Sequence, residues 1–471
     1  MRLLFILTVV TLLANPFAFY GQINEQKANA QEIDAFHRSE SCATSTCHGG
    51  TNRNAPAWTH SFSTHRSIDP HATSGLLLLD GDSRRIVARL APSAKDSEVA
   101  FHNVLRERCI SCHATVSPKE CEPSGQIPAE ILGRGVTCAS CHGEANGWVD
   151  QHYLRSWSTR PNREKTGFRE TARLLDRAQT CVRCHVGSRT DDGLIRDVNH
   201  DLIAAGHPAL RFDMLVYHRN LPKHWDREKR SERELAESAV RVRKVGRAVS
   251  FAAAAALSSE RAADHLQRPR SVPWPELADY DCFACHQSLT MASYQLPSSD
   301  LIRSPLHISD GLPVWNAWHS ISQLDFRDSS VYLKDLSPHR SDPRRFLVAG
   351  RKVAEHFSNL ATRTAAEPSS PSAALGEIVD LLKGRPPVDW HEAAIAYLQL
   401  EAACEDLSNR SNPIVNIDQS EQTLRELLQL LRFDAHVAPP NASRARSPYK
   451  FDAGLFRRKV LDLFNTSPVT P

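Results

Sequence analysis

Apolar positions recur at helical spacing in the second half of the chain. Residues 226–268 contain no proline, and their apolar positions predict one long helix that a kink at Gly246 could interrupt. These positions are Leu235, Ala239, Val242, Val249, Ala253 and Leu257. Similar periodic segments predict further helices at 343–362, 373–383, 389–407, 418–433 and 453–464. Cys404 shares an apolar stripe with Tyr397 and Leu400, so we expect it to be a buried core thiol.

The first half follows a different pattern. From about residue 31 to 225 the chain is rich in histidine, glycine, proline and short turns, and it has few long periodic segments. Hydrophobic residues make up 41% of the whole chain and charged residues 24%, which is ordinary for a globular protein. The expected fold class is therefore mainly α with extensive loops and little sheet.

The extreme N-terminus has the pattern of a secretory signal peptide. Met1-Arg2 precedes the apolar run LLFILTVVTLLA, which Asn15-Pro16 ends, and Ala28-Asn29-Ala30 offers a cleavage site after Ala30. The alternative is an uncleaved membrane anchor from Leu3 to Tyr20. Its unbroken part is short for a hydrocarbon core of about 30 Å. We therefore expect export, in a bacterium to the periplasm, with cleavage of residues 1–30.

Ten of the twelve cysteines lie in five close pairs, and a histidine follows each pair. Four pairs have the form C-x-x-C-H: CISCH at 109–113, CASCH at 138–142, CVRCH at 181–185 and CFACH at 282–286. The fifth, SCATSTCHGG at 41–50, has four residues between its cysteines. The residues concerned are Cys42, Cys47, His48, Cys109, Cys112, His113, Cys138, Cys141, His142, Cys181, Cys184, His185, Cys282, Cys285 and His286.

The C-x-x-C-H spacing is typical of haem c attachment. Each thiol adds to one vinyl group of the porphyrin, and the adjacent histidine binds the iron from the proximal side. Zinc ribbons need paired knuckles and have no reason for a histidine after every second cysteine. Thioredoxin-like pairs occur once per domain, and disulfides across so short a loop constrain little. We therefore predict haem c at these four motifs, within a domain organised around its haems.

The longer stretch at 41–50 leaves two interpretations open. A fifth haem is possible if the small residues Ala43 to Thr46 bulge outward, and Gly49-Gly50 would then allow a close backbone approach or a tight turn. The alternative is a disulfide between Cys42 and Cys47 with an unrelated His48.

The second axial ligand of each iron is predicted from residue counts. The chain has 22 histidines, of which five are proximal, whereas Met214 and Met291 are the only methionines after the signal peptide. His–Met ligation, which raises the haem potential, is thus available at two sites at most. We expect bis-histidine ligation in general, and a haem without a distal ligand is the alternative at some site.

The net charge of the chain gives little further information about its function. The chain has a net charge of +3, but the two propionates of each haem would bring the loaded protein to near neutral or mildly acidic. The sequence has no basic patch interleaved with aromatic residues, so we expect no nucleic-acid partner.

These motifs resemble a known family. The five clusters, with GVTCASCHGEANGW at 135–148 and NHDLIAAGHPALRF at 199–212, are similar to multihaem cytochromes c of the cytochrome c-554/c-prime type, within the hydroxylamine oxidoreductase superfamily. The resemblance covers roughly residues 38–290. Two features depart from it: the longer first motif, and a fifth motif where the type member has four haems. The expected organisation is a signal peptide (1–30), a multihaem domain (31–225), a long helix with the fifth motif (226–300) and a helical region (301–471).

The resemblance also implies distal ligands. Trp58 followed by DPHATSG makes His71 one candidate, AAGHP makes His207 a second, and the histidine after CHGEANGW makes His152 a third. His102 and His200 are weaker candidates. For each of them the alternative is a surface or hydrogen-bonded histidine.

Two functions stay open at this point. The first is an electron carrier between redox partners, such as a quinol-oxidising membrane protein and a terminal reductase. The second is an oxidoreductase that acts on a small nitrogen or sulfur compound at one open haem; the superfamily contains both kinds. A colourless scaffold held by zinc or disulfides is a third interpretation. Membrane association is expected only through an uncleaved N-terminus.

Overall fold

The computed structural model of the chain describes eight stretches: 42–116, 125–190, 193–225, 238–280, 342–384, 390–409, 417–432 and 451–465. It also describes Phe326, Tyr332, Leu336, Pro386 and Pro387 between them. Three predicted features lie outside the described residues: the signal peptide, Met291 and the fifth motif with Cys282, Cys285 and His286.

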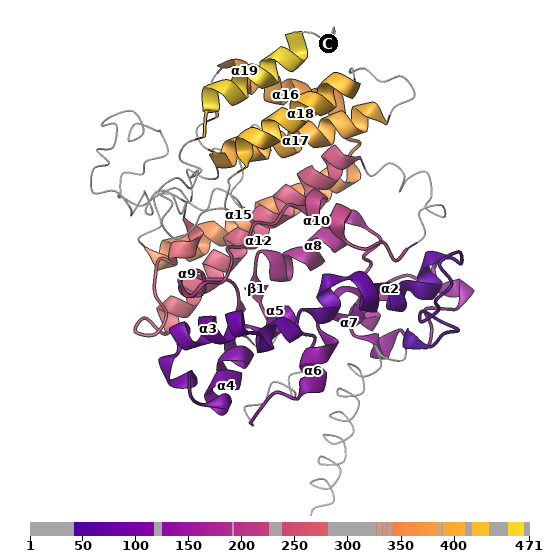
Figure 1. Cartoon of the computed structure of the whole chain (residues 1–471), viewed down its shortest axis with the longest axis vertical. Coiled ribbons are helices and arrows are strands. Elements are labelled where there is room, and N and C mark those ends of the chain that lie inside the picture. The colour runs from indigo at the N-terminus through magenta and orange to yellow at the C-terminus, as the bar shows by residue number, and fades with distance from the viewer. Residues whose placement is uncertain are drawn as a thin grey trace, which may run out of the picture.

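The described part is mainly α, which confirms the expected fold class. Its only strands are β1 (Ser188–Arg189) and β2 (Ile195–Arg196), which form one antiparallel pair. The rest consists of helices and loops (Figure 1).

The described elements between residues 42 and 225 are short, and the longest helix among them has 12 residues. The α-helices are α2 (Ser61–Ile68), α3 (Gly81–Leu90), α4 (Glu98–Arg108), α5 (Ile110–His113), α6 (Ala129–Arg134), α7 (Cys138–His142), α8 (Leu174–His185), α9 (His200–Ala205) and α10 (Met214–Asn220). The 3₁₀ turns of this part are η2 (Ala57–His60), η3 (Pro70–Thr73), η4 (Leu76–Leu79), η5 (Pro92–Ala94), η7 (Ala145–Gly147), η8 (Arg155–Trp157) and η9 (Arg163–Thr166). The prediction of a first half without long periodic helices is confirmed.

Long helices form the second half. They are α12 (Ala239–Gln267), α15 (Pro343–Ala366), α16 (Pro371–Gly384), α17 (Trp390–Ser408), α18 (Ile417–Leu431) and α19 (Ala453–Asn465), and η10 (Leu277–Asp279) follows α12. The last five α-helices agree with the predicted segments within a few residues. Cys404 of α17 is buried, as expected.

The long helix starts later than predicted, at Ala239 instead of 226. The first N–H groups of a helix lack partners within the helix. Here the Ser238 side chain accepts from the N–H of Arg241, and Asp406 of α17 accepts from the N–H groups of Ala239 (2.7 Å) and Val240 (3.0 Å). These hydrogen bonds fix the first residue of the helix. Those to Asp406 are tertiary contacts, since Asp406 lies far along the chain.

Gly246 lies in the middle of α12 because another helix approaches closely there. A Cβ at this position would collide with the side chain of Met214 in α10. Met214 is buried in the same apolar core.

One large apolar core joins the long helices. Figure 1 shows α12 and α15 side by side, with α16–α19 on one side and the short helices on the other. Phe251 of α12 and Phe357 of α15 are both buried, with ring centroids 4.7 Å apart. Helices α8 and α10 of the first half also contribute to this core.

The rest of the first half, as far as the structure describes it, has two small apolar clusters. One joins residues of α3–α6 such as Phe101, Leu105 and Leu132, and the other consists of Ala145, Trp148 and Trp157. None of the described helices has the length and hydropathy needed to cross a membrane.

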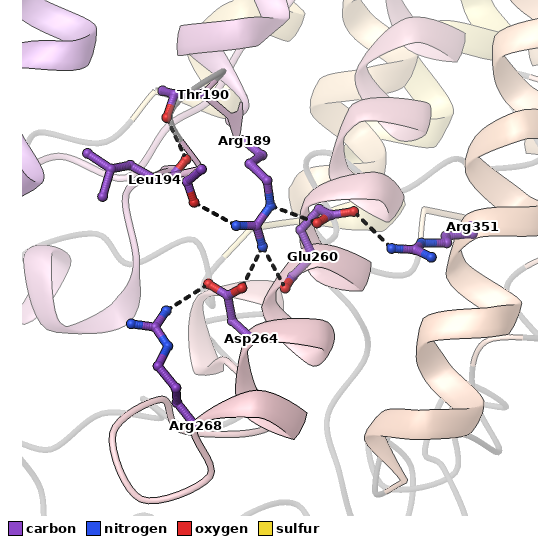
Figure 2. Close-up of polar contacts among 8 residues, drawn as sticks. Arg189, Thr190, Leu194, Glu260, Asp264, Arg268 and Arg351 are labelled. Atoms are coloured by element: carbon purple, nitrogen blue, oxygen red, sulfur yellow. Dashed lines mark hydrogen bonds and ion pairs between the residues drawn. The ribbon is translucent and has the colours of Figure 1, made fainter. Parts of the chain in front are cut away.

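A polar network connects the two halves at the β-hairpin (Figure 2). Arg189 of β1 donates to Glu260 Oε2 at 2.7 Å and to Asp264 Oδ1 at 2.6 Å, both on α12. Arg351 of α15 also donates to Glu260, and Arg268 donates to Asp264. The hairpin that follows the CVRCH motif is thus tied to α12.

Candidate functional site

In three motifs the cysteines and the histidine lie on one helical turn. CISCH begins at the end of α4 and forms α5, CASCH is α7, and CVRCH is the last turn of α8. Residues i, i+3 and i+4 share one face of a helix, so both sulfurs and the imidazole point to the same side. Gly143 ends α7 with φ 85°, and a Cβ there would collide with the carbonyl oxygen of Gly167.

The stretch at 41–50 reaches a similar arrangement with a bulge. The N–H of His48 donates to the carbonyl of Cys42 at 3.2 Å, as the N–H of His113 donates to that of Cys109 at 3.2 Å. The two additional residues are accommodated by a turn in which the N–H of Cys47 donates to Thr44 O at 2.9 Å. A Cβ at Gly49 would collide with the carbonyl of Ala43, so the glycine is needed for this turn.

Each described motif histidine faces a second histidine. The ring centroids are 6.1 Å apart in the His48–His152 pair, 6.0 Å for His71–His185, 6.3 Å for His113–His207 and 6.3 Å for His142–His224. An imidazole nitrogen binds a metal at about 2 Å, so two rings on opposite sides of one ion have centroids about 6 Å apart. The separations of all four pairs fit one iron between the rings.

The hydrogen bonds of these rings leave the other nitrogen for a metal. The Nδ1–H groups of five of them donate to backbone carbonyls, which can only accept. The acceptors are Trp58 O for His48, Ser74 O for His113, Val149 O for His152, Pro208 O for His207 and Pro222 O for His224. His142 Nδ1 lies 3.3 Å from the Thr171 hydroxyl, and His71 Nδ1 lies 2.9 Å from Asp69 Oδ1. Such bonds fix the tautomer and the orientation of a metal-bound imidazole.

The protonation state of several rings also suits iron. Burial lowers the pKa of His142 and of His185 to about 4, and it lowers the pKa of His113 and His224 as well. These rings are neutral at pH 7, which is the form that binds a metal. His71 differs, because its hydrogen bond to Asp69 raises its pKa.

Four of the motif thiols suit thioether bonds better than thiolate–metal bonds. Burial raises the pKa of Cys109, Cys138 and Cys181 to about 11 and that of Cys141 to about 12. Zinc binds the thiolate, which is disfavoured at these positions, whereas an uncharged thioether tolerates burial. The described ranges contain no group of three or more His, Cys, Asp or Glu residues that could hold a metal ion by themselves. The nine described cysteines, with Cys42 and Cys47 among them, are not joined in disulfides.

Exposed aromatic side chains border two of the pairs. Trp58 contacts His48 at 5.9 Å between centroids, and Tyr153 contacts His152 at 5.9 Å. Tyr217 contacts His185 at 4.8 Å. All three are exposed although each adjoins a ligand candidate. A flat apolar group between the imidazoles would be in contact with such rings, so these residues fit a porphyrin.

The four pairs lie in a definite order. Besides burial, the neighbouring Cys42 raises the pKa of Cys138, and Cys181 raises that of Cys141. Cys112 and Cys184 share a hydrogen bond. The His48 motif is therefore a neighbour of the His142 motif, the His142 motif of the His185 motif, and the His185 motif of the His113 motif.

Three of the candidate distal ligands, His71, His152 and His207, lie in these pairs. His102 does not: its Nδ1 accepts from the N–H of Ile127 at 3.1 Å, so its proton is on Nε2, which lies 3.8 Å from Glu98. This is the geometry of a hydrogen-bonded core histidine. The family pattern in the sequence cannot distinguish such a histidine from an iron ligand. His200 begins α9, and its backbone N–H donates to Glu276 at 2.8 Å.

His224, the partner of His142, was not among the sequence candidates. It stands in the segment LPKHW, without a cysteine motif or a family pattern beside it. The only signal in the sequence is the surplus of histidines, which indicates that more distal ligands exist but not which residues they are.

Comparison with known proteins agrees with this geometry. A family model described as cytochrome c554 and c-prime matches residues 86–143, which contain the CISCH and CASCH motifs. The match supports a c-type cytochrome. It implies haem c, with its iron, and a part in electron transfer for this cytochrome. Searches of curated proteins and of solved structures found no match to the chain.

Proposed function

We propose that the protein is an exported multihaem cytochrome c, of the hydroxylamine oxidoreductase superfamily, that carries electrons through closely packed bis-histidine haems. The observation that carries this proposal is the set of four imidazole pairs with centroids 6.0 to 6.3 Å apart. In each pair one ring directly follows a cysteine pair in the sequence.

The chain would bind each haem from two sides. The two cysteines of each motif would form thioether bonds to the porphyrin, and the motif histidine would bind the iron. The second ligand would come from His152, His207, His224 and His71 for the motifs that end in His48, His113, His142 and His185, respectively. Bound haem iron supplies one-electron redox chemistry. The side chains set its ligation, burial and spacing, and no side chain needs to react.

The order of the pairs supports a linear path. The His48 pair is at one end of this order and the His113 pair at the other, so the two could serve different partners. A quinol-oxidising membrane protein and a terminal reductase are the partner classes that we propose. The apolar run before Asn15-Pro16 supports export to the periplasm, where c-type haem is attached.

The fifth motif is the position at which the alternative function remains. At the four described motifs a second histidine faces the proximal one, so both axial positions would be taken. An open haem that reduces or oxidises a small nitrogen or sulfur compound would therefore be the one at Cys282, Cys285 and His286. His200 is the remaining candidate for a distal ligand there.

The intact mass of the denatured protein tests the haem number. The full chain is produced in a host that attaches c-type haem, and covalent haem survives denaturation. We expect a chain that begins at Gln31 and carries five haems. A Cys42→Ala/Cys47→Ala variant is expected to carry four. Fewer than four haems in the unmodified chain would contradict the proposal.

Carbon monoxide separates the two functions. A reduced haem with two histidine ligands does not bind it rapidly, whereas an open haem does. No rapid binding favours the electron carrier, and rapid binding to one haem favours the enzyme. Rapid binding to several haems would contradict the four ligand pairs.

A further inference from the structure

One ligand pair differs from the other three in that one of its rings is hydrogen-bonded to a carboxylate. Asp69 accepts from the Nδ1–H of His71 at 2.9 Å and from its backbone N–H at 3.0 Å. The Asp69 side chain is only 4% exposed. The other ring hydrogen bonds described for the pairs involve uncharged oxygens of backbone carbonyls and hydroxyl groups.

A carboxylate in this position changes the relative stability of the two oxidation states of the metal that the imidazole binds. A ligand that donates its second N–H to a carboxylate becomes more basic and stabilises the more positive state of the metal. The negative charge acts in the same direction, and burial reduces the screening by water. Both effects favour ferric over ferrous iron.

We propose that Asp69 lowers the reduction potential of the haem held between His71 and His185. This inference rests on the proposed function. The neighbours of this haem would be the haems of the His142 and His113 pairs. Asp69 would therefore lower the reduction potential of a haem in the middle of the electron path. Electrons on a partly reduced protein would then reside more on the neighbouring haems than on this one.

A positively charged group lies beside one of the two cysteines that would attach the same haem. Arg196 Nη1 donates to Cys184 Sγ at 3.2 Å, and Cys184 is one of the two attachment sites of this haem. A cation beside the porphyrin favours the ferrous state. Charge removal at Asp69 and at Arg196 should therefore shift one midpoint potential in opposite directions.

A spectroelectrochemical titration of the haem-loaded full chain tests the proposal. Asp69→Asn keeps acceptors for both hydrogen bonds and removes the charge. We expect one component to shift to a higher midpoint potential, with a smaller shift of the others and unchanged low-spin spectra. Arg196→Gln is expected to shift the same component downward. His71→Ala identifies that component, because this haem alone loses its sixth ligand.

Asp82→Asn is the matched control, since it removes the same charge from a side chain that is 71% exposed. A shift in Asp69→Asn no larger than in Asp82→Asn, or a shift of a component other than the one that His71→Ala changes, would overturn the inference. If Asp69→Asn loses this haem, Asp69→Glu and Asp69→Gln form a second pair; the Gln variant is expected to have the higher potential, and equal potentials would overturn the inference. A protein without covalent haem by mass would contradict the proposed function itself, which is a separate result.

Discussion

The two halves of the molecule are stabilised by different means. From α12 onward, long helices bury their apolar faces against one another, and one continuous core joins α12 and α15–α19. Among the described residues between 42 and 173, short helices and turns contain two small apolar clusters, and each of the three motifs there has a histidine that faces a second histidine. A helix as short as α5 or α7 has little stability of its own. We therefore expect the first half to depend on bound haem for folding, whereas the second half has a large apolar core of its own.

The largest expected effect is the loss of folded structure in the first half when the chain carries no haem. Replacement of both cysteines by serine in all five motifs should leave 42–173 without its apolar centre, since cofactor binding and folding are coupled. We expect this part to lose protection from hydrogen exchange and to be cleaved first by a protease. Helices α12 and α15–α17 should remain protected.

The haem-loaded chain is the reference for this experiment. Equal protection of both halves in the serine variant would contradict the comparison, because the first half would then fold on its small clusters alone. Equal loss in both halves would show that α8 and α10 couple them into one cooperative unit.

A core substitution tests the second half. Phe357 is 1% exposed and packs on Phe251 of α12. Phe357→Ala should lower the free energy of unfolding by about 3–5 kcal/mol, since it removes buried apolar surface and leaves a cavity. Chemical denaturation followed by far-UV circular dichroism measures this. The haem spectra of the native variant should not change, and Val348→Ala, at a 56% exposed position of the same helix, should have little effect.

A ligand substitution should have a local effect in the first half. His224→Ala is expected to convert one haem from low spin to high spin and to let it bind carbon monoxide, because the sixth ligand of that iron is lost. His102→Ala is the control, since His102 is buried and accepts a hydrogen bond from the N–H of Ile127. High-spin haem in the His102 variant, or none in the His224 variant, would contradict the assignment of the pairs.

These cases indicate how much of the molecule could be predicted from sequence. The helices of the second half follow from apolar periodicity, because their positions depend on which face of each helix is buried. The first residue of α12 could not be predicted from this periodicity, because Asp406, far along the chain, accepts hydrogen bonds from the first N–H groups of the helix.

The site divides in a similar way. The motif histidines follow from local spacing, but the partner of each is chosen by tertiary structure. His71 pairs with His185 and His224 with His142, and no local pattern joins these residues. His102, which precedes a motif, accepts a hydrogen bond from the N–H of Ile127, and this agrees with the alternative of a hydrogen-bonded histidine.

The smallest expected effect concerns the polar link between the halves. Arg189 ties β1 to Glu260 and Asp264 of α12 (Figure 2), but its side chain is 30% exposed. Ion pairs at such positions contribute about 0–1 kcal/mol, and Arg351 and Arg268 remain to neutralise the two carboxylates. Arg189→Ala should therefore lower the free energy of unfolding by about 1 kcal/mol, with unchanged haem spectra. A loss as large as that of Phe357→Ala would mean that this network, and not the apolar packing of α8 and α10 on α12, holds the halves together. A loss of about 1 kcal/mol would indicate that the apolar packing of α8 and α10 on α12 holds the halves together, because Arg189→Ala leaves that packing unchanged.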